Sequence, residues 1–96
     1  TWYTAPFNEH FVHFSEDAAA YIAACKIKCI GIDYLSVGGM NNGIPVHQHI
    51  LGAGIWIVEG LFLNKVPVGS YAFLSMPIFL DQADGAPARA MLKLTT

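Results

Sequence analysis

Residues 45–63 read PVHQHILGAGIWIVEGLFL, a segment in which polar side chains enclose an apolar run. His47 and His49 stand just before the run, and Glu59 closes it. A short helix followed by a strand would bring one of the imidazoles and the carboxylate together. Imidazole and carboxylate groups are the ligands of metal sites and the partners of acid–base pairs. The segment therefore predicts half of a metal site or an acid–base pair.

The same pattern also has a purely structural interpretation. A histidine beside a proline turn is often a half-buried side chain, and a glutamate at the end of a strand is often solvated. In a helix of about 3.6 residues per turn, His47 and His49 point roughly 200° apart. A single site can therefore receive only one of these two imidazoles.

Length and composition limit the class of protein. Ninety-six residues form one small domain with room for one core and one site. The chain is 54% hydrophobic and 12% charged, whereas an average soluble domain is roughly 45–50% apolar and about 25% charged. Such a surface is short of charge, so we expect a homo-oligomer or a part of a larger assembly.

Charge pattern and apolar runs argue against nucleic acid and membrane partners. The five Lys and Arg residues are scattered and the formal net charge is −2, so no basic surface faces phosphates. No apolar run approaches the ~18–20 residues of a membrane-spanning helix.

Cys25 and Cys29 have C-x3-C spacing, which matches neither a zinc knuckle nor a redox motif. We expect reduced thiols and a cytoplasmic location.

Residues 1–14, TWYTAPFNEHFVHF, are rich in aromatic side chains and follow no regular period. We predict an extended aromatic arm over residues 1–14, which lays its rings on another surface, and a single α/β domain over residues 15–96. His10 and His13 are either interface side chains or metal ligands.

The remaining elements are expected in the order helix, strand, helix and three strands. Ser15 offers an N-cap, and the Ala-rich stretch behind it predicts a helix over residues 15–26. Its expected apolar face is formed by Ala18, Tyr21, Ile22 and Cys25. The expected strands cover residues 27–33, 55–59, 69–80 and 88–94. We therefore predict an α/β fold in which one or more mixed sheets carry one or two packed helices.

Three long segments resemble one known family. They are SEDAAAYIAACKIKCIGIDYLSVGG (15–39), PVHQHILGAGIWIVEGL (45–61) and VPVGSYAFLSMPIFLDQADGAPARAML (66–92). In this order they are similar to the C-terminal half of the cyclase family of metal-dependent hydrolases, which includes bacterial kynurenine formamidases and isatin hydrolase. The resemblance covers nearly the whole chain from Phe14 onward. It implies the C-terminal half of the swivelling β/β/α cyclase-family fold.

The resemblance implies hydrolysis of an amide or formamide by a metal-bound water. The principal metal site of the family is an H-x-G-T-H-x-D motif, and these 96 residues do not contain it. At positions that match the family, His47 and Glu59 are implied as ligands of a second ion, and His49 is left to packing. Because a catalytic zinc usually has three protein ligands, two imply weakly bound Zn or Mn and no hydrolysis by this chain alone.

A pocket is implied at the carboxyl end of the first strand, where α/β sheets bind ligands. Asp33 is either a polar pocket group or a cap for the loop behind it. Ser36 matches the family pattern, whereas Tyr34 and Gly38 depart from it. The expected pocket residues are Asp33, Tyr34, Ser36, Met40 and Trp56.

Three functions are compatible with these observations. The preferred one is a cyclase-family half-domain that self-associates and has no hydrolase activity of its own. The second is a small-molecule binding module that uses the residual pocket. The third is one part of a split metal-dependent amide or formamide hydrolase that a separate chain completes. In the preferred case, the homo-oligomer is expected to be held by the aromatic arm and the sheet faces.

Overall fold

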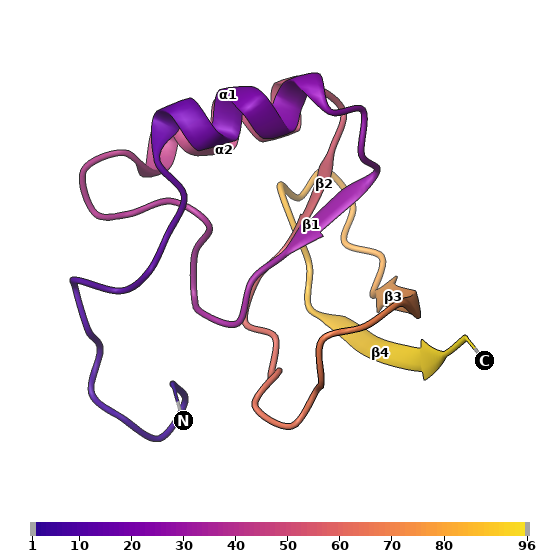
Figure 1. Ribbon diagram of the computed structural model, residues 1–96. Coiled ribbons are helices and arrows are strands. Elements are labelled where there is room, and N and C mark those ends of the chain that lie inside the picture. The colour runs from indigo at the N-terminus through magenta and orange to yellow at the C-terminus, as the bar shows by residue number, and fades with distance from the viewer. Residues whose placement is uncertain (1, 96) are drawn as a thin grey trace. The chain divides into compact units, whose positions relative to one another are not determined.

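The computed structural model describes residues 2–95 and confirms an α/β chain (Figure 1). Its elements are α1 (Glu16–Ala24), β1 (Cys29–Gly31), α2 (Gly43–Gly52), β2 (Trp56–Val58), β3 (Tyr71–Pro77) and β4 (Ala88–Leu94). Internal contacts divide the chain into two compact units, 1–64 and 65–96. The first unit holds both helices and the first two strands, and the second holds the other two strands.

Helix α1 begins where its sequence caps the backbone. The Ser15 Oγ accepts a hydrogen bond from the Ala18 N–H at 3.1 Å, and two acidic residues follow in the first turn, which the helix dipole favours. The helix is shorter than the predicted stretch 15–26. Lys26 has a φ of 57°, a left-handed conformation through which a right-handed helix does not continue.

The buried side of α1 differs in part from the predicted one. Ile22 packs against the core and Ala18 is half-buried, as expected. Tyr21 is 73% exposed and Cys25 is exposed, whereas Ala19, which we did not place on this face, is fully buried. A run of three alanines presents a similar small surface in either rotation, so periodicity alone did not single out Ala19.

Helix α2 begins at Gly43, two residues before Pro45. Proline is tolerated there because the first N–H groups of a helix have no intrahelical partner. Asn42 connects the helix start to the segment before α1, since its Nδ2 donates to the Phe14 carbonyl at 3.2 Å. Behind the helix, Gly54 has a φ of 77°, and this left-handed residue turns the chain toward β2.

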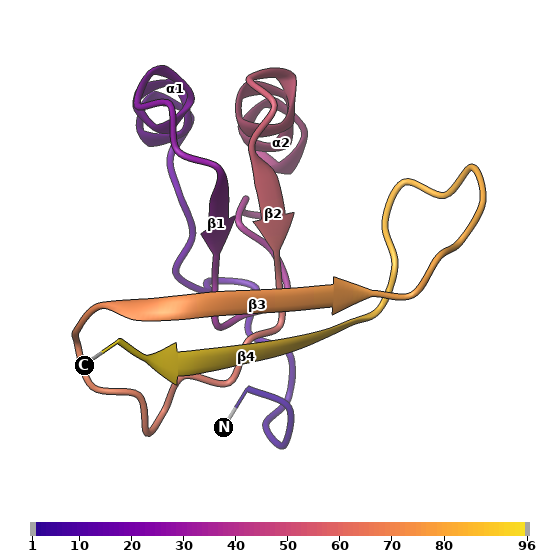
Figure 2. The same cartoon turned by 90° about the vertical axis from the view of Figure 1, so that its right-hand side faces the viewer.

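Strands β1 and β2 pair in parallel, and α2 connects them. Figure 2 shows α1 and α2 side by side, with the two strands running away from them in the same direction. The core of this first unit is formed by Ala19, Val37, Val46, Ile50 and Ile55. Because the strands are parallel, their carboxyl ends meet at one edge, where Asp33 and Glu59 follow them.

The second unit is an antiparallel hairpin of β3 and β4. Side chains alternate between the two faces of such a ribbon. One face, called here the uncharged hairpin face, consists of Tyr71, Phe73, Ser75, Pro77, Ala88, Ala90, Leu92 and Leu94. The opposite face carries Arg89 and Lys93 among Ala72, Leu74, Met76 and Met91. The two faces of the hairpin therefore differ in charge: one has no charged side chain, and the other, called here the basic face, has two basic side chains.

The predicted α/β fold with packed helices is confirmed, but the four expected strands do not share one sheet. The four strands form two separate two-stranded sheets, one parallel and one antiparallel. β1 and β2 are only three residues long, so each offers few backbone groups to a further strand. β3 and β4 are close in sequence, and their backbones hydrogen-bond to each other. Beyond Pro77, Ile78 N–H still donates to the Pro87 carbonyl at 3.0 Å, but Pro87 has no N–H to return this bond.

The aromatic arm contributes to the first unit. Phe11 is buried and stacks on Tyr34 with ring centroids 4.8 Å apart, and Trp2 Nε1 donates to the Leu61 carbonyl at 2.9 Å. The internal contacts thus group residues 2–14 with the elements up to residue 64. The sequence predicts a different division, into an arm over residues 1–14 and a single domain over residues 15–96. Those domain boundaries stay a prediction.

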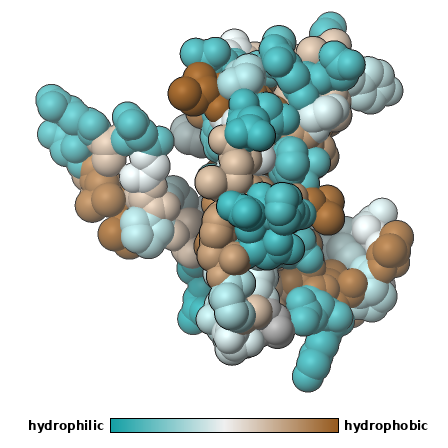
Figure 3. All heavy atoms as spheres, turned by 90° about the vertical axis from the view of Figure 1, so that its left-hand side faces the viewer, coloured by the Kyte–Doolittle hydropathy of each residue, from teal (hydrophilic) through white to brown (hydrophobic). Residues whose placement is uncertain are grey.

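Apolar side chains also reach the surface, as the brown patches of Figure 3 show. Ile44 and Trp56 are about three-quarters exposed, at 74% and 75%. Within residues 2–95, neither helix has the length and apolar character needed to cross a membrane.

Candidate metal half-site

Glu59 lies directly behind β2 and is held at two points. Its Oε2 accepts a hydrogen bond from the Val37 N–H at 2.8 Å and lies 3.1 Å from the His47 Nε2. The side chains of His47 and Glu59 are 31% and 30% exposed. The core residue Val37 therefore fixes the carboxylate at the edge of the core, within reach of solvent.

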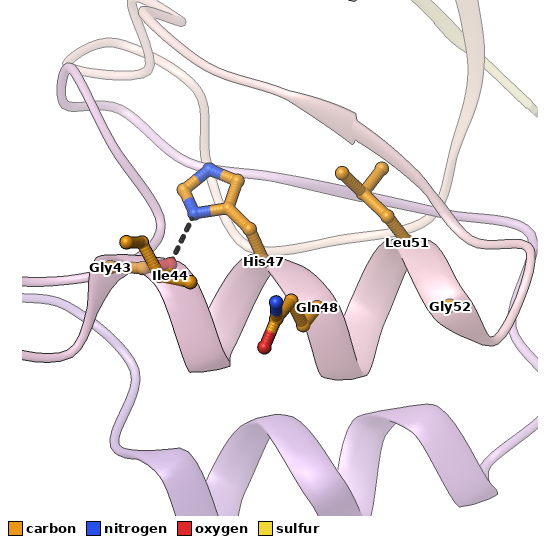
Figure 4. A pocket seen from close by; sticks show the side chains of 6 residues that line it. All are labelled: Gly43, Ile44, His47, Gln48, Leu51 and Gly52. Atoms are coloured by element: carbon orange, nitrogen blue, oxygen red, sulfur yellow. Dashed lines mark hydrogen bonds between the residues drawn. The ribbon is translucent and has the colours of Figure 1, made fainter.

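His47 lies on α2 and is oriented by the backbone of its own helix. Its Nδ1 is 2.7 Å from the Gly43 carbonyl oxygen (Figure 4). A carbonyl oxygen only accepts hydrogen bonds, so Nδ1 carries the proton of this contact. Nε2 then either donates to Glu59, when it is also protonated, or offers its lone pair to a cation. A backbone carbonyl on the far ring nitrogen is a common support of metal-binding histidines.

The pair has a spacing that suits two ligands of one ion. Ligand atoms about 2.1 Å from a tetrahedral zinc lie about 3.4 Å from each other, and the Nε2–Oε2 distance here is 3.1 Å. A shift of a few tenths of an ångström would admit the ion. Within residues 2–95, no third His, Cys, Asp or Glu completes a metal-binding group with them. The two residues fit part of a metal site.

The other histidines lie elsewhere. His49 Nε2 is 3.4 Å from the Glu16 Oε1 at the start of α1, so it faces away from Glu59, as the helix period requires. His10 is exposed beside Glu9, and His13 Nδ1 lies 2.8 Å from the Phe11 carbonyl oxygen. Of the two histidines on α2, the structure brings only His47 to Glu59.

The five predicted pocket residues have different surroundings. Asp33 and Tyr34 line a hollow of about 290 Å³ at the carboxyl end of β1. The Ser36 Oγ accepts from the Gly38 N–H at 3.1 Å and so shapes the loop that ends at α2. Met40 and Trp56 are 62% and 75% exposed and do not line this hollow. Their role in a pocket stays a prediction.

A wider, open hollow of about 790 Å³ lies on the outer side of α2. Ile44, His47 and Leu51 project from that side of the helix (Figure 4). The spacing of these three positions, i, i+3 and i+7, marks one face of a helix. An apolar surface therefore adjoins His47.

Sequence reasoning missed the two backbone groups that build the site. The Val37 N–H and the Gly43 carbonyl have no signature of their own, because every residue but proline carries the same pair. A usable signal was the spacing of Gly43 and His47, since residues four apart lie on one side of a helix.

The fold defines the class of protein. A solved structure described as a potential metal-dependent hydrolase with cyclase activity matches 90% of this chain with a TM-score of 0.84 and 41% sequence identity. The match covers 43% of that longer chain. The architecture is that of part of a cyclase-type metal-dependent hydrolase.

Curated relatives agree with this class. Cyclase-like protein 3 of Oryza sativa subsp. japonica is 39% identical over 88 residues, which are 90% of this chain and 33% of the relative. Kynurenine formamidase of Bacillus cereus is 32% identical over 88 residues, which are 91% of this chain and 42% of the relative. No family model matches the chain. The predicted resemblance is confirmed: the chain is homologous to cyclase-family proteins and spans about a third to two-fifths of their length.

Proposed function

We propose that this chain is a cyclase-family half-domain that self-associates, carries a partial metal site and does not hydrolyse formamides alone. The observation that carries the proposal is the orientation of His47: one ring nitrogen is held by a backbone carbonyl, and the other faces Glu59 at 3.1 Å. This arrangement is suited to holding a cation between imidazole and carboxylate.

The residues of this chain would bind and orient. His47 and Glu59 would hold Zn²⁺ or Mn²⁺ weakly, since they supply two ligands instead of the usual three or four. The Val37 N–H keeps the carboxylate in place through the bond at 2.8 Å. A divalent ion in such a site supplies Lewis-acid polarisation of a carbonyl and lowers the pKa of a bound water.

A second candidate is one part of a split metal-dependent amide or formamide hydrolase. The relatives are two to three times longer than the matched segment, and the apolar surface of Ile44 and Leu51 adjoins His47. A second polypeptide that docks there could bring the remaining ligands. This candidate predicts activity only when both parts are present.

A third candidate is a binding module for a small molecule, which the hollow beside Asp33 and Tyr34 supports.

A cytoplasmic location stays a prediction. It is supported by Cys25 and Cys29, both of which are free thiols, as is usual in reducing compartments.

Self-association is supported by the hairpin. A two-stranded hairpin is only marginally stable by itself in water, and the uncharged hairpin face offers apolar side chains such as Phe73 and Leu94 without a charged neighbour on that face. The aromatic arm packs within the first unit, where Phe11 stacks on Tyr34. We therefore propose the hairpin face, more than the arm, as the self-association surface.

The activity claim is tested by assaying formanilide, a simple N-formyl aromatic amine, with the purified chain and added Zn²⁺ or Mn²⁺. We expect a rate equal to that of the metal ion alone and equal to that of a His47→Ala variant. Turnover above this background that disappears in His47→Ala would overturn the claim, since it would show that the chain completes a catalytic metal site without a partner.

A further inference from the structure

A second site separate from the metal half-site lies at the carboxyl end of β1. It is the hollow of about 290 Å³ whose lining includes the aromatic rings of Trp2, Phe11 and Tyr34 and the polar side chains of Asn8, Asp33 and Asn64. The volume lies at the lower end of the range for ligand pockets, which begins near 300 Å³. A ligand of about ten non-hydrogen atoms is therefore the appropriate size.

The aromatic side of the hollow is fixed before any ligand arrives. Phe11 stacks on Tyr34 with centroids 4.8 Å apart, and the Asn8 N–H donates to the Tyr34 Oη at 3.0 Å. Trp2 is fixed by its bond to the Leu61 carbonyl. A preorganised wall loses little conformational freedom on binding, which favours even a small ligand.

The polar side of the hollow, formed by Asp33 and Asn64, is exposed to solvent. Among residues 2–95, the Asp33 carboxylate and the Asn64 amide make no hydrogen bond or ion pair within the chain. Among the described residues, the lining holds no Lys, Arg or His side chain. Asp33 is the only charged side chain among these lining residues.

We propose that this hollow binds a small organic ammonium ion with an apolar tail. The ammonium group pairs with the Asp33 carboxylate, and the tail lies against the rings of Trp2 and Phe11. A carboxylate beside aromatic rings favours a cation, because both the negative charge and the electron-rich ring faces attract it. The Asn64 amide oxygen offers a further acceptor for an N–H of the same group. The inference rests on the binding-module candidate above and uses neither His47 nor Glu59.

The test is a titration of the full ¹⁵N-labelled chain with phenethylammonium, followed by NMR in the presence of EDTA. We expect saturable shifts of the Trp2 indole and Asn64 amide signals, with a dissociation constant on the order of 1 mM. Phenethyl alcohol, which is neutral, and 3-phenylpropanoate, which is an anion, serve as matched probes. Each should bind at least about fivefold more weakly than the ammonium ion.

Three variants test whether the ammonium ion binds in this hollow. Asp33→Asn should weaken phenethylammonium binding by about fivefold or more, whereas Asp84→Asn, in the exposed β3–β4 connection, should leave it unchanged. His47→Ala should also leave it unchanged. Equal binding of the alcohol and the ammonium ion, undiminished binding by Asp33→Asn, or no shift up to about 20 mM would overturn the proposal. Loss of binding in His47→Ala would also overturn it, because the ligand would then lie at the metal half-site.

Discussion

At the level of single residues, Cys25 and Cys29 have different surroundings although they are four positions apart. Cys25 is exposed, whereas burial raises the pKa of the Cys29 thiol above its ordinary value. The thiolate is the reactive form, so iodoacetamide should alkylate Cys25 first at pH 8. Mass spectrometry of Cys25→Ser and Cys29→Ser variants would measure the two rates. Faster alkylation of Cys29 would contradict the burial seen here.

The direction of the Cys29 shift also fixes a pH dependence. A raised pKa means that the folded chain keeps the thiol proton at pH values where the unfolded chain has lost it. The contribution of Cys29 to stability is thus fully present below the ordinary value of 9.0 and is lost as the pH rises through the folded pKa. Cys29→Ser should make the free energy of unfolding less dependent on pH above that value than in the wild type.

The position of His47 relative to Glu59 illustrates what a sequence can predict for a site. The helix period shows that His47 and His49 cannot both face one carboxylate, and the resemblance selected His47. The partners of the pair, the Val37 N–H and the Gly43 carbonyl, follow from loop geometry that no side-chain pattern encodes. The lining of the hollow beside Asp33 could be recognised only from the folded structure, because Trp2 and Asn64 come from distant parts of the sequence.

At the level of elements, the loop before α2 depends on close backbone contact at Gly38. A Cβ placed on Gly38 would lie 2.6 Å from the Gly43 Cα and 3.3 Å from the Val46 Cβ. Gly38→Ala should therefore push the loop away from the start of α2 and lower the free energy of unfolding by about 1–3 kcal/mol. Urea denaturation followed by circular dichroism would measure this loss.

Gly52 at the end of α2 is the matched control. A Cβ there would meet no atom within 4 Å, and alanine has the higher helix propensity, so Gly52→Ala should be neutral or stabilising by about 0.5–1 kcal/mol. If both substitutions had the same effect, the close packing of the loop on α2 would be disproved.

The elements themselves were predictable where local chemistry sets them. The Ser15 cap and the range 88–94 were read correctly from side-chain types. The lengths of β1 and β2 could not be predicted in this way. Both strands end where the chain turns toward Tyr34 and Gly60. That turn is set by long-range hydrogen bonds, such as the bond from Gly60 N–H to the Tyr34 carbonyl at 2.7 Å. The separation into two sheets likewise depends on pairing that periodicity does not specify.

At the level of the whole molecule, the uncharged hairpin face is the proposed self-association surface. Phe73→Glu places a charge in the middle of this face, and Met76→Glu places the same charge on the opposite, basic face. We expect sedimentation at micromolar concentration to show an oligomer for the wild type and for Met76→Glu, and dissociation for Phe73→Glu. A wild-type monomer of 10.4 kDa would contradict self-association.

The central claim is that His47 and Glu59 form a metal half-site, and a calorimetric titration with Zn²⁺ and Mn²⁺ tests it most directly. Two ligands should give a dissociation constant above about 10 µM for the wild-type chain. His47→Ala should weaken binding by about tenfold or more. His49→Ala removes only an exposed contact with Glu16 and should change binding by less than about twofold.

The decisive comparison is the His47→Ala, Glu59→Ala double variant, with circular dichroism as the check that it folds. The half-site predicts that this variant no longer binds either ion while its helix content is retained. Metal binding that is unchanged from the wild type would show that the contact of 3.1 Å between His47 and Glu59 is structural and that the ion binds elsewhere.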